Sequence, residues 1–337
     1  MTKTEIQQII DDLSTVSDKR QYWLVRTMGG QYYEDFVQKG FIAIGYDQVN
    51  LSDIAAANTK DNTGKQILAS IVKKTFPKEP RPNYIAKQLI DFSYNLKKGD
   101  IVIIPSSSSD RVSIGQVMET PVFIEQNISS DDNKVCPFEK RKKIKWLKTH
   151  LWFDRLDPKL LHLKYTRRTV TQIDALTAGI IDRLITPIFV KQNDAHLSLD
   201  IRQQEPIKAA EMFETWLELF QVAEDFGKEY NLEIQKNDYE AKINVQSPGT
   251  IEFISYSIIG IVTLSTIVAA IIGAEYEANT KLFKFKIKSE GLIKQITNYL
   301  NNKTDRKFKE QMIKKVQKMN ISPDEIVKIL EQLNKNN

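Results

Sequence analysis

The chain has little of the chemistry that catalytic and metal sites need. Its 337 residues contain one cysteine, Cys136, and three histidines, His150, His162 and His196. A single cysteine excludes an intrachain disulfide and a cysteine zinc cluster, and the histidines do not have the spacing of a zinc motif such as HExxH. The GxxxxGK[ST] and GxGxxG phosphate-binding patterns are also missing from the sequence. We therefore expect no bound metal and no cofactor, and nothing indicates a hydrolytic triad.

The N-terminus lacks the apolar segment of a signal peptide. It reads MTKTEIQQIIDDL, which is polar and charged. The composition is ordinary for a globular protein, with 41% hydrophobic and 27% charged residues, and the length is enough for two domains that each bury a core. We therefore expect a folded, cytoplasmic protein.

Positive charge is present in small excess, with a formal net charge of +5, but it is unevenly distributed. A basic run fills residues 140–148, and further cations follow as far as Arg168. Concentrated basic side chains favour phosphate contact, and the alternation of lysine with Ile144 and Trp146 predicts a strand with one solvent-facing side. The alternative is a strand edge that its lysines protect from aggregation. The candidate phosphate-binding residues are Lys142, Lys143, Lys145 and Lys148.

The segment from Lys98 to Gly115 predicts a β-hairpin. A Gly-Asp turn leads into the apolar run 101–104, and a serine-rich loop at 105–110 separates this run from the returning strand. Further strands are expected at 22–26 and 41–46, and helices at 64–75 and 84–96. Small β-barrels that bind nucleobases contain such strands, with aromatic side chains from neighbouring strands around the pocket. The pattern therefore predicts a binding function without naming the ligand.

Read together, these segments resemble the PUA-like superfamily, in particular the EVE-like modules at the N-terminus of bacterial restriction and phage-defence proteins. The resemblance lies in YWLVR at 22–26, FIAIGY at 41–46, KGDIV at 98–102, IGQV at 114–117 and the strand at 143–148. It covers the first half of the chain and implies a barrel that binds modified bases in DNA or RNA between aromatic side chains. Trp23 and Tyr46 lie on the strands that carry it, and Tyr46 stands where related modules usually have tryptophan.

A bound base needs a flat apolar partner, and stacking on an aromatic ring contributes about 1–3 kcal/mol per base. The alternative for each ring, including that of Trp152, is a place in the core of the barrel. The serine loop can donate hydrogen bonds to a base, or can serve only as a turn. The candidate base-binding residues are Trp23, Arg26, Tyr46, Ser106, Ser107 and Trp146.

The second half of the chain contains an uncharged stretch from Phe253 to Ala274. About 20 apolar residues span a bilayer, and the lysines that follow from Lys281 would suit a cytoplasmic flank. The alternative is a helix at 258–274 that is buried under a sheet or against a second copy of the chain. Predicted strands at 239–245, 251–254 and 282–287 favour the buried helix, because a bilayer would keep them from pairing.

One weak nuclease signal is present. Asp238, Glu240 and Lys242 resemble the end of a signature in which carboxylates hold a metal ion beside a lysine. The acidic strand that should precede it is not evident, so a binding protein is favoured over an enzyme.

The sequence therefore predicts an α+β protein. A PUA-like barrel with peripheral helices occupies 1–187, a smaller α/β domain with the apolar helix occupies 188–302, and a helical tail occupies 303–337. The resemblance implies a nucleic-acid sensor, with DNA preferred to RNA and a modified base as target, in restriction or anti-phage defence. The apolar helix is also a candidate contact between copies of the chain in a homo-oligomer. The alternative function is an inner-membrane-associated defence effector whose first domain senses a nucleotide or phage ligand, and a metal-dependent nuclease is favoured less.

Overall fold

The computed structural model describes residues 11, 13–59, 62–119, 121–126, 128, 132–201, 207–243, 249–279, 292–303 and 306–321. The chain divides into two compact units: a first unit, Lys19–Ile181, and a second unit made of Met1–Asp18 with Asp182–Asn337. The boundary lies inside helix α7 (Ala175–Ile185) rather than at Pro187. The N-terminal segment joins the second unit because β1 (Thr15–Val16) pairs in parallel with β9 (Ile188–Lys191).

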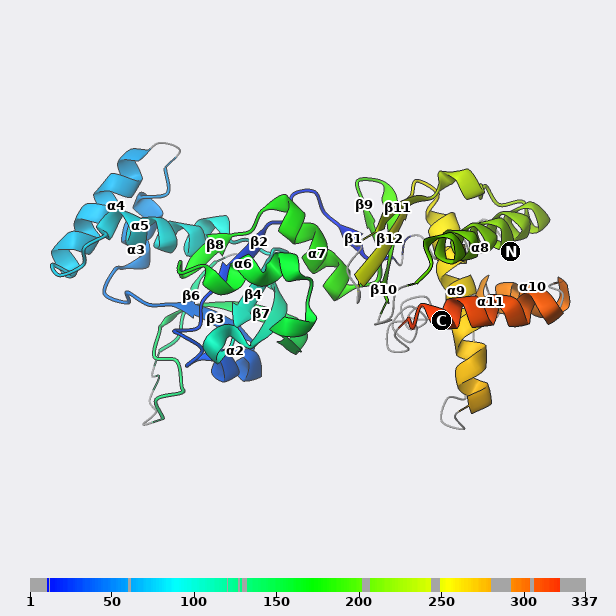
Figure 1. Cartoon of the computed structure of the whole chain (residues 1–337). Helices are drawn as coiled ribbons and strands as arrows, with labels where there is room; N and C mark the ends of the chain where they lie inside the picture. Colours follow the sequence, from blue (N-terminus) through cyan, green and yellow to red (C-terminus); the bar gives the residue numbers. More distant parts are fainter. Residues whose placement is uncertain are drawn as a thin grey trace. The chain divides into compact units, whose positions relative to one another are not determined.

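The first unit is built on a curled sheet with the strand order β3-β7-β5-β4-β2-β8 (Figure 1). The strands are β2 (Tyr22–Val25), β3 (Phe41–Ile44), β4 (Ile101–Pro105), β5 (Arg111–Val117), β7 (Lys140–Trp152) and β8 (Val170–Gln172), and the short β6 (Phe123–Ile124) pairs with β7. Two register shifts interrupt the pairing of β5 with β7, between Val112 and Ile114 and between Ile114 and Gly115. Such irregularities bend a strand and increase its twist, so they contribute to the curl.

Helices connect the buried strands of the first unit. Every residue of β2, β3 and β4 is buried, as expected of short apolar runs covered on both sides. α2 (Tyr33–Lys39) ends at Gly40, whose φ of 69° is the left-handed conformation that favours glycine at this position. The other helices before β4 are α3 (Leu51–Ala56), α4 (Asn62–Thr75), α5 (Pro82–Ile90) and the π-helical turn η1 (Asp91–Asn95). The segment 84–96, expected to be one helix, is thus α5 continued by a π-helical turn.

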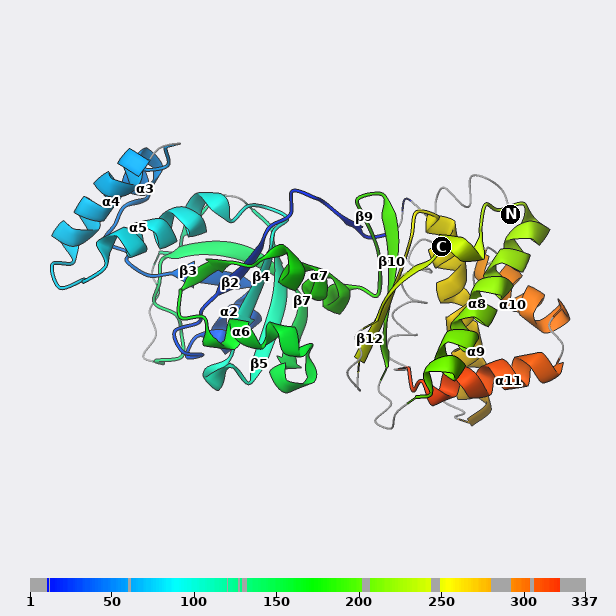
Figure 2. The same ribbon diagram turned by 45° about the horizontal axis from the view of Figure 1, so that its top comes forward.

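In its described residues, the second unit has a five-stranded sheet with four helices on one side (Figure 2). The strand order is β1-β9-β10-β12-β11, where β10 is Asp194–Ile201, β11 is Glu240–Ile243 and β12 is Gly249–Ser255. The helices are α8 (Ala209–Tyr230), α9 (Ile258–Asn279), α10 (Leu292–Lys303) and α11 (Arg306–Lys318). Core residues come from β9, β10, β12 and all four helices, so α11 belongs to this unit and not to a separate tail.

The apolar stretch forms β12 and then α9. Every residue from Ile261 to Ala269 is 0% exposed, in contact with other elements of the same unit. Over the described part of the chain, we find no helix with both the length and the apolar character required to cross a bilayer. The strand expected at 282–287 and the part of the expected helical tail that follows Ile321 lie outside the described residues.

Candidate nucleic-acid interface

The start of the basic run on β7 is buried, although the sequence predicts a solvent-facing strand. Lys140, Arg141 and Lys142 are 1%, 5% and 0% exposed. Lys142 Nζ donates a hydrogen bond to the carbonyl oxygen of Ser93, in the middle of η1, at 3.3 Å. Burial lowers the pKa of Lys142 to about 8, although the nearby charge of Asp100 opposes this shift. A fully buried ammonium group does not reach a phosphate, so the structure corrects Lys142 from a phosphate ligand to a core residue.

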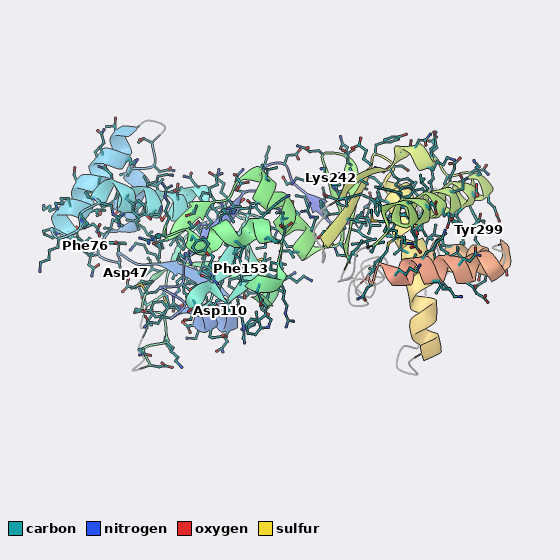
Figure 3. All side chains as sticks on the ribbon, viewed as in Figure 1. Asp47, Phe76, Asp110, Phe153, Lys242 and Tyr299 are labelled. Atoms are coloured by element: carbon teal, nitrogen blue, oxygen red, sulfur yellow. The ribbon has the colours of Figure 1, made fainter. Side chains whose placement is uncertain are left out.

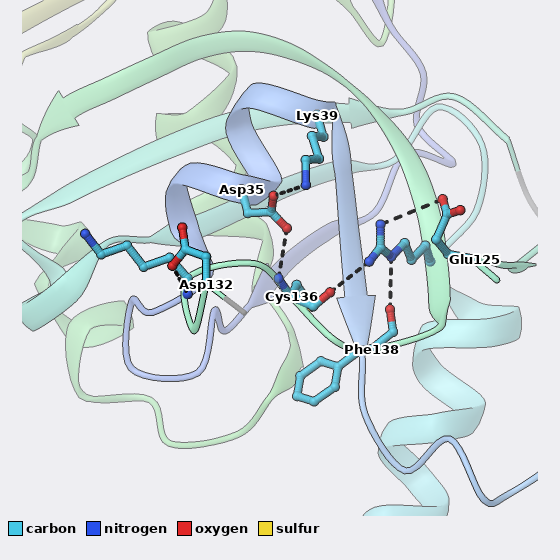
Figure 4. Close-up of polar contacts among 8 residues, drawn as sticks. Asp35, Lys39, Glu125, Asp132, Cys136 and Phe138 are labelled. Carbon is cyan, nitrogen blue, oxygen red and sulfur yellow. Dashed lines mark hydrogen bonds and ion pairs between the residues drawn. The ribbon is translucent and has the colours of Figure 1, made fainter. Parts of the chain in front are cut away.

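Arg141 fastens the loop that precedes β7. Its guanidinium donates hydrogen bonds to the carbonyl oxygens of Cys136 and Phe138, each at 2.9 Å (Figure 4). It also lies 4.1 Å from the ring centre of Phe41. Glu125 completes the cluster at 3.8 Å. Cys136 is buried, and burial raises the pKa of its thiol to about 11. Arg141 and Cys136 are therefore structural residues in this arrangement.

The remaining lysines of the run are accessible. Lys143 and Lys145 are exposed and Lys148 is half-buried. Lys143 lies 3.4 Å from Glu119 across an exposed ion pair, which is worth little in water. These three residues keep their predicted role as phosphate contacts.

Two of the three predicted rings are packed into the fold. Trp23 is 3% exposed, and its indole Nε1 donates to Asp100 Oδ2 at 3.1 Å, so it offers no free face to a base. This corrects the base-binding prediction for Trp23. Trp146 is half-buried: its Nε1 donates to the carbonyl oxygen of Phe36 at 3.0 Å, and its ring covers Gly115. A Cβ atom at Gly115 would lie 2.7 Å from that ring, so the glycine permits the packing.

The third ring, Tyr46, lies in an unusual turn after β3, which we call the Tyr46 turn (Gly45–Asp47). Tyr46 has a φ of 64°, in the left-handed region that bulky residues rarely adopt. Lys140 holds the turn: its Nζ donates to the carbonyl oxygen of Tyr46 at 3.1 Å and lies 3.5 Å from the carboxylate of Asp47. The backbone N–H of Glu139 also donates to Asp47 Oδ1, at 3.2 Å. Strained residues that the surrounding structure holds in place are concentrated at ligand sites.

Aromatic and acidic side chains surround the Tyr46 turn. The ring of Phe76, from the end of α4, stands at 87° to that of Tyr46 with centres 5.2 Å apart, and the Tyr46 hydroxyl donates to Glu79 Oε2 at 3.4 Å. Phe138 packs against Gly45, where an added Cβ atom would meet its ring at 3.2 Å. Figure 3 labels Asp47 and Phe76 in this part of the first unit.

The electrostatics keep the Tyr46 hydroxyl as a hydrogen-bond donor. Burial and the neighbouring carboxylate of Glu79 raise the pKa of Tyr46. Tyr46, Phe76 and Phe138 are each half-buried, so their rings are partly accessible. The turn thus combines an aromatic ring surface, a phenol donor and a carboxylate acceptor. The ring surface can stack on the face of a heterocycle, and the phenol and the carboxylate can form hydrogen bonds with its edge. Sequence reasoning missed Phe76, Glu79 and Phe138, because they come from a helical connection and a loop that carry no spacing signal.

Arg26 and the serine loop form a separate group at the end of β2 and β4. The Arg26 guanidinium donates to the carbonyl oxygens of Lys164 and Thr166, each at 2.8 Å, and to Ser109 Oγ at 3.1 Å. Ser106 Oγ accepts a hydrogen bond from the backbone N–H of Arg111 at 2.9 Å, and Ser107 is exposed. Arg26 thus joins α6 (Leu161–Tyr165) to the serine loop. Its donors are directed at backbone carbonyl oxygens and not at a ligand site.

The weak nuclease candidates lie in the second unit. Asp238 closes the short turn η5 (Lys236–Asp238), and Glu240 and Lys242 follow on β11. Lys242 pairs across the sheet with Glu252, which binds Arg183 and His196, each at 2.9 Å. Within the described ranges, no three His, Cys, Asp or Glu side chains are grouped so as to hold a metal ion.

Comparison with known proteins adds one match. A family model described as a domain of unknown function (DUF8426) matches residues 22–174. No curated protein and no solved structure matches the chain. The matched range begins at β2 and ends just after β8, so it corresponds to the sheet of the first unit.

Proposed function

We propose that the first unit is a PUA-like module that binds nucleic acid and recognises a base at the Tyr46 turn, as part of a bacterial restriction or anti-phage defence system. The sequence resemblance supports the module, and the curled sheet is compatible with it. The observation that carries the proposal is the left-handed backbone of Tyr46, held by the buried ammonium of Lys140. The fold maintains a strained, half-buried ring where the resemblance implies base stacking.

The neighbouring side chains fit this role. A base leaves its stack at a cost of a few kcal/mol, which stacking on Tyr46 and hydrogen bonding to its edge offset. The carboxylate of Glu79 lies within 3.4 Å of the Tyr46 hydroxyl and is placed to accept a hydrogen bond from a base amino group. Exposed lysines on β7 supply contacts to phosphate, which add affinity without sequence preference.

A titration of the full-length chain with labelled DNA tests the proposal. The probes are duplexes that contain cytosine, 5-methylcytosine or N6-methyladenine at one position, and fluorescence anisotropy measures their binding. Tyr46→Leu should weaken binding of the preferred duplex by roughly 5- to 150-fold, the equivalent of removing one stack. Tyr46→Phe should keep most of the affinity, because the ring remains.

The matched control is Tyr256→Ala, which removes a ring that is 67% exposed in the second unit. This variant should bind like the unmodified chain. Circular dichroism establishes that each variant is folded. Equal affinity of Tyr46→Leu and the unmodified chain, or no binding to any duplex, would contradict base recognition at the Tyr46 turn.

A further inference from the structure

Three segments of the first unit meet at the loop between β4 and β5. Arg111 pairs with Trp152 across β5 and β7, and the backbone N–H of Phe153 donates to the carbonyl oxygen of Asp110 at 2.9 Å. Lys164 of α6 lies 3.9 Å from the Asp110 carboxylate. We call this surface the Trp152 platform; it comprises Ser106–Arg111, Trp152–Arg155 and Leu161–Arg168. Figure 3 labels Asp110 and Phe153 within it.

The platform presents aromatic rings to solvent. Trp152 is 44% exposed at the end of β7, and the guanidinium of Arg111 lies 4.4 Å from its ring centre. Tyr165, at the end of α6, is 77% exposed, and Leu161 is 43% exposed. Contact between large apolar rings and water is unfavourable, so surfaces where exposed apolar side chains are clustered commonly bind a partner.

Cations accompany the rings. The segment 152–168 contains five Lys and Arg residues and only two Asp residues. Arg155, Lys159, Arg167 and Arg168 are exposed, and Lys164 is half-buried. An excess of cations around exposed rings is complementary to a polyanion that carries flat heterocycles.

Buried contacts hold the platform in shape. Thr27 Oγ1 donates to the carbonyl oxygen of Pro105 at 2.6 Å, and a Cβ atom on Gly30 would lie 2.0 Å from the backbone nitrogen of Ser107. The Arg26 guanidinium joins Ser109 to the carbonyls at the end of α6. A surface that is already ordered loses little conformational entropy when a ligand binds.

We propose that the Trp152 platform binds single-stranded nucleic acid, with an unstacked base on the ring of Trp152 and phosphates beside Arg155, Arg167 and Arg168. A single strand offers both base faces and phosphates, whereas a duplex keeps its base faces stacked inside. This surface shares no residue with the Tyr46 turn, so the inference goes beyond base recognition there and does not depend on it.

The test is an anisotropy titration of the full-length chain with labelled oligothymidylate of about 20 nucleotides, an unmodified single strand that spans the site sizes typical of such surfaces. Trp152→Ala should weaken binding by roughly 5- to 150-fold, and Trp152→Phe should restore most of the affinity. The Arg167→Ser/Arg168→Ser variant should bind more weakly, with a salt dependence that is less steep by about 0.7 in log–log slope for each phosphate that the variant no longer neutralises.

Two matched variants serve as controls. Tyr256→Ala removes another exposed ring, and Lys97→Ser/Lys98→Ser removes two consecutive lysines before the opposite end of β4. Both should bind oligothymidylate like the unmodified chain. The loss of affinity caused by Trp152→Ala should be the same in a chain that also carries Tyr46→Leu, which separates the platform from the Tyr46 turn.

Three outcomes would contradict the proposal that the Trp152 platform binds single-stranded nucleic acid. The first is an unchanged affinity for oligothymidylate in Trp152→Ala. The second is that a duplex of the same length binds the unmodified chain as tightly as the single strand does, and that Trp152→Ala weakens binding of both to the same extent. The third is the absence of any binding to oligothymidylate by the folded, unmodified chain.

Discussion

Trp23 and Asp100 are joined by a buried hydrogen bond at the start of two parallel strands. The indole Nε1 of Trp23 donates to Asp100 Oδ2 at 3.1 Å, and the same carboxylate accepts hydrogen bonds from the backbone N–H groups of Gln21 and Lys97 at 3.0 and 2.8 Å. Trp23 is 3% exposed and Asp100 is 4% exposed. The carboxylate therefore links β2 to the turn before β4, and the indole is part of this link.

Trp23→Phe should destabilise the first unit without affecting nucleic-acid binding. The variant keeps a ring in the core but removes a hydrogen bond to a charged group, which is worth about 1.5–3 kcal/mol. Urea unfolding of the full-length chain should show that loss, and the affinity for DNA should equal that of the unmodified chain. A loss of affinity at unchanged stability would restore Trp23 as a ligand-binding residue.

Lys142→Met should stabilise the protein at neutral pH. The folded state lowers the pKa of Lys142 from 10.5 to about 8, so below pH 8 it carries a buried cation that the unfolded chain hydrates freely. Between pH 8 and 10.5 the unfolded state binds more protons than the folded state, so stability of the unmodified chain rises with pH. Methionine removes this cost, which amounts to about 3 kcal/mol.

Urea unfolding at intervals from pH 7 to pH 10.5 measures the effect. The advantage of Lys142→Met should be largest at pH 7 and should decline as the pH rises through this window. Lys143→Met is the control on the adjacent, exposed position and should show no such decline. A constant difference between Lys142→Met and the unmodified chain would mean that Lys142 keeps its ordinary pKa.

Arg141→Met should destabilise the loop before β7. The change leaves the carbonyl oxygens of Cys136 and Phe138 without their buried donor (Figure 4). It also removes the cation from the ring of Phe41. We expect a loss of about 2–4 kcal/mol in unfolding free energy and faster alkylation of Cys136. Lys145→Met, on the exposed part of β7, should change stability by less than about 0.5 kcal/mol. Similar losses for both variants would contradict the structural role of Arg141.

Glu252→Gln should destabilise the second unit. Burial alone would raise the pKa of Glu252, but the hydrogen bond from His196 and the charge of Arg183 outweigh it, so the pKa lies below its ordinary value. Breaking this buried pair should cost about 3 kcal/mol near neutral pH.

The pH dependence follows from that direction. A carboxyl group with a lowered pKa stabilises the fold above its unfolded pKa, and the contribution is lost as pH falls through the folded pKa. The difference between the unmodified chain and Glu252→Gln should therefore shrink as the pH falls below about 4.5, as followed by thermal unfolding. Glu240→Gln, exposed on the neighbouring strand, is the control. Equal effects of both variants would argue against the ion cluster.

Sequence patterns correctly predicted the strands and helices that are determined by neighbouring residues. The hairpin expected at 98–115 is β4 and β5, and the strand expected at 22–26 contains β2. In each case neighbouring residues fix the backbone conformation and the buried side, so a short window is enough.

Local sequence patterns identify only part of the candidate site. The resemblance identifies Tyr46, but its partners Phe76 and Glu79 lie some thirty residues further along the chain and reach it through α3 and α4. Arg26 has donors suited to a ligand, yet it donates to carbonyl oxygens at the end of α6 and just beyond it, more than a hundred residues away. Contacts of this kind depend on chain topology, which no local pattern encodes.

Residue identity and short-range periodicity are enough to predict the alternation of strands and helices, the uneven placement of positive charge and the scarcity of metal and thiol chemistry. The burial of Lys140, Arg141 and Lys142, beside an accessible Lys143 and Trp152, depends instead on how the strands of the first unit pair. β3 and β6 pair with the start of β7, where the carbonyl oxygens of Tyr46 and Cys136 accept hydrogen bonds from Lys140 and Arg141 and offset the cost of burying these two cations.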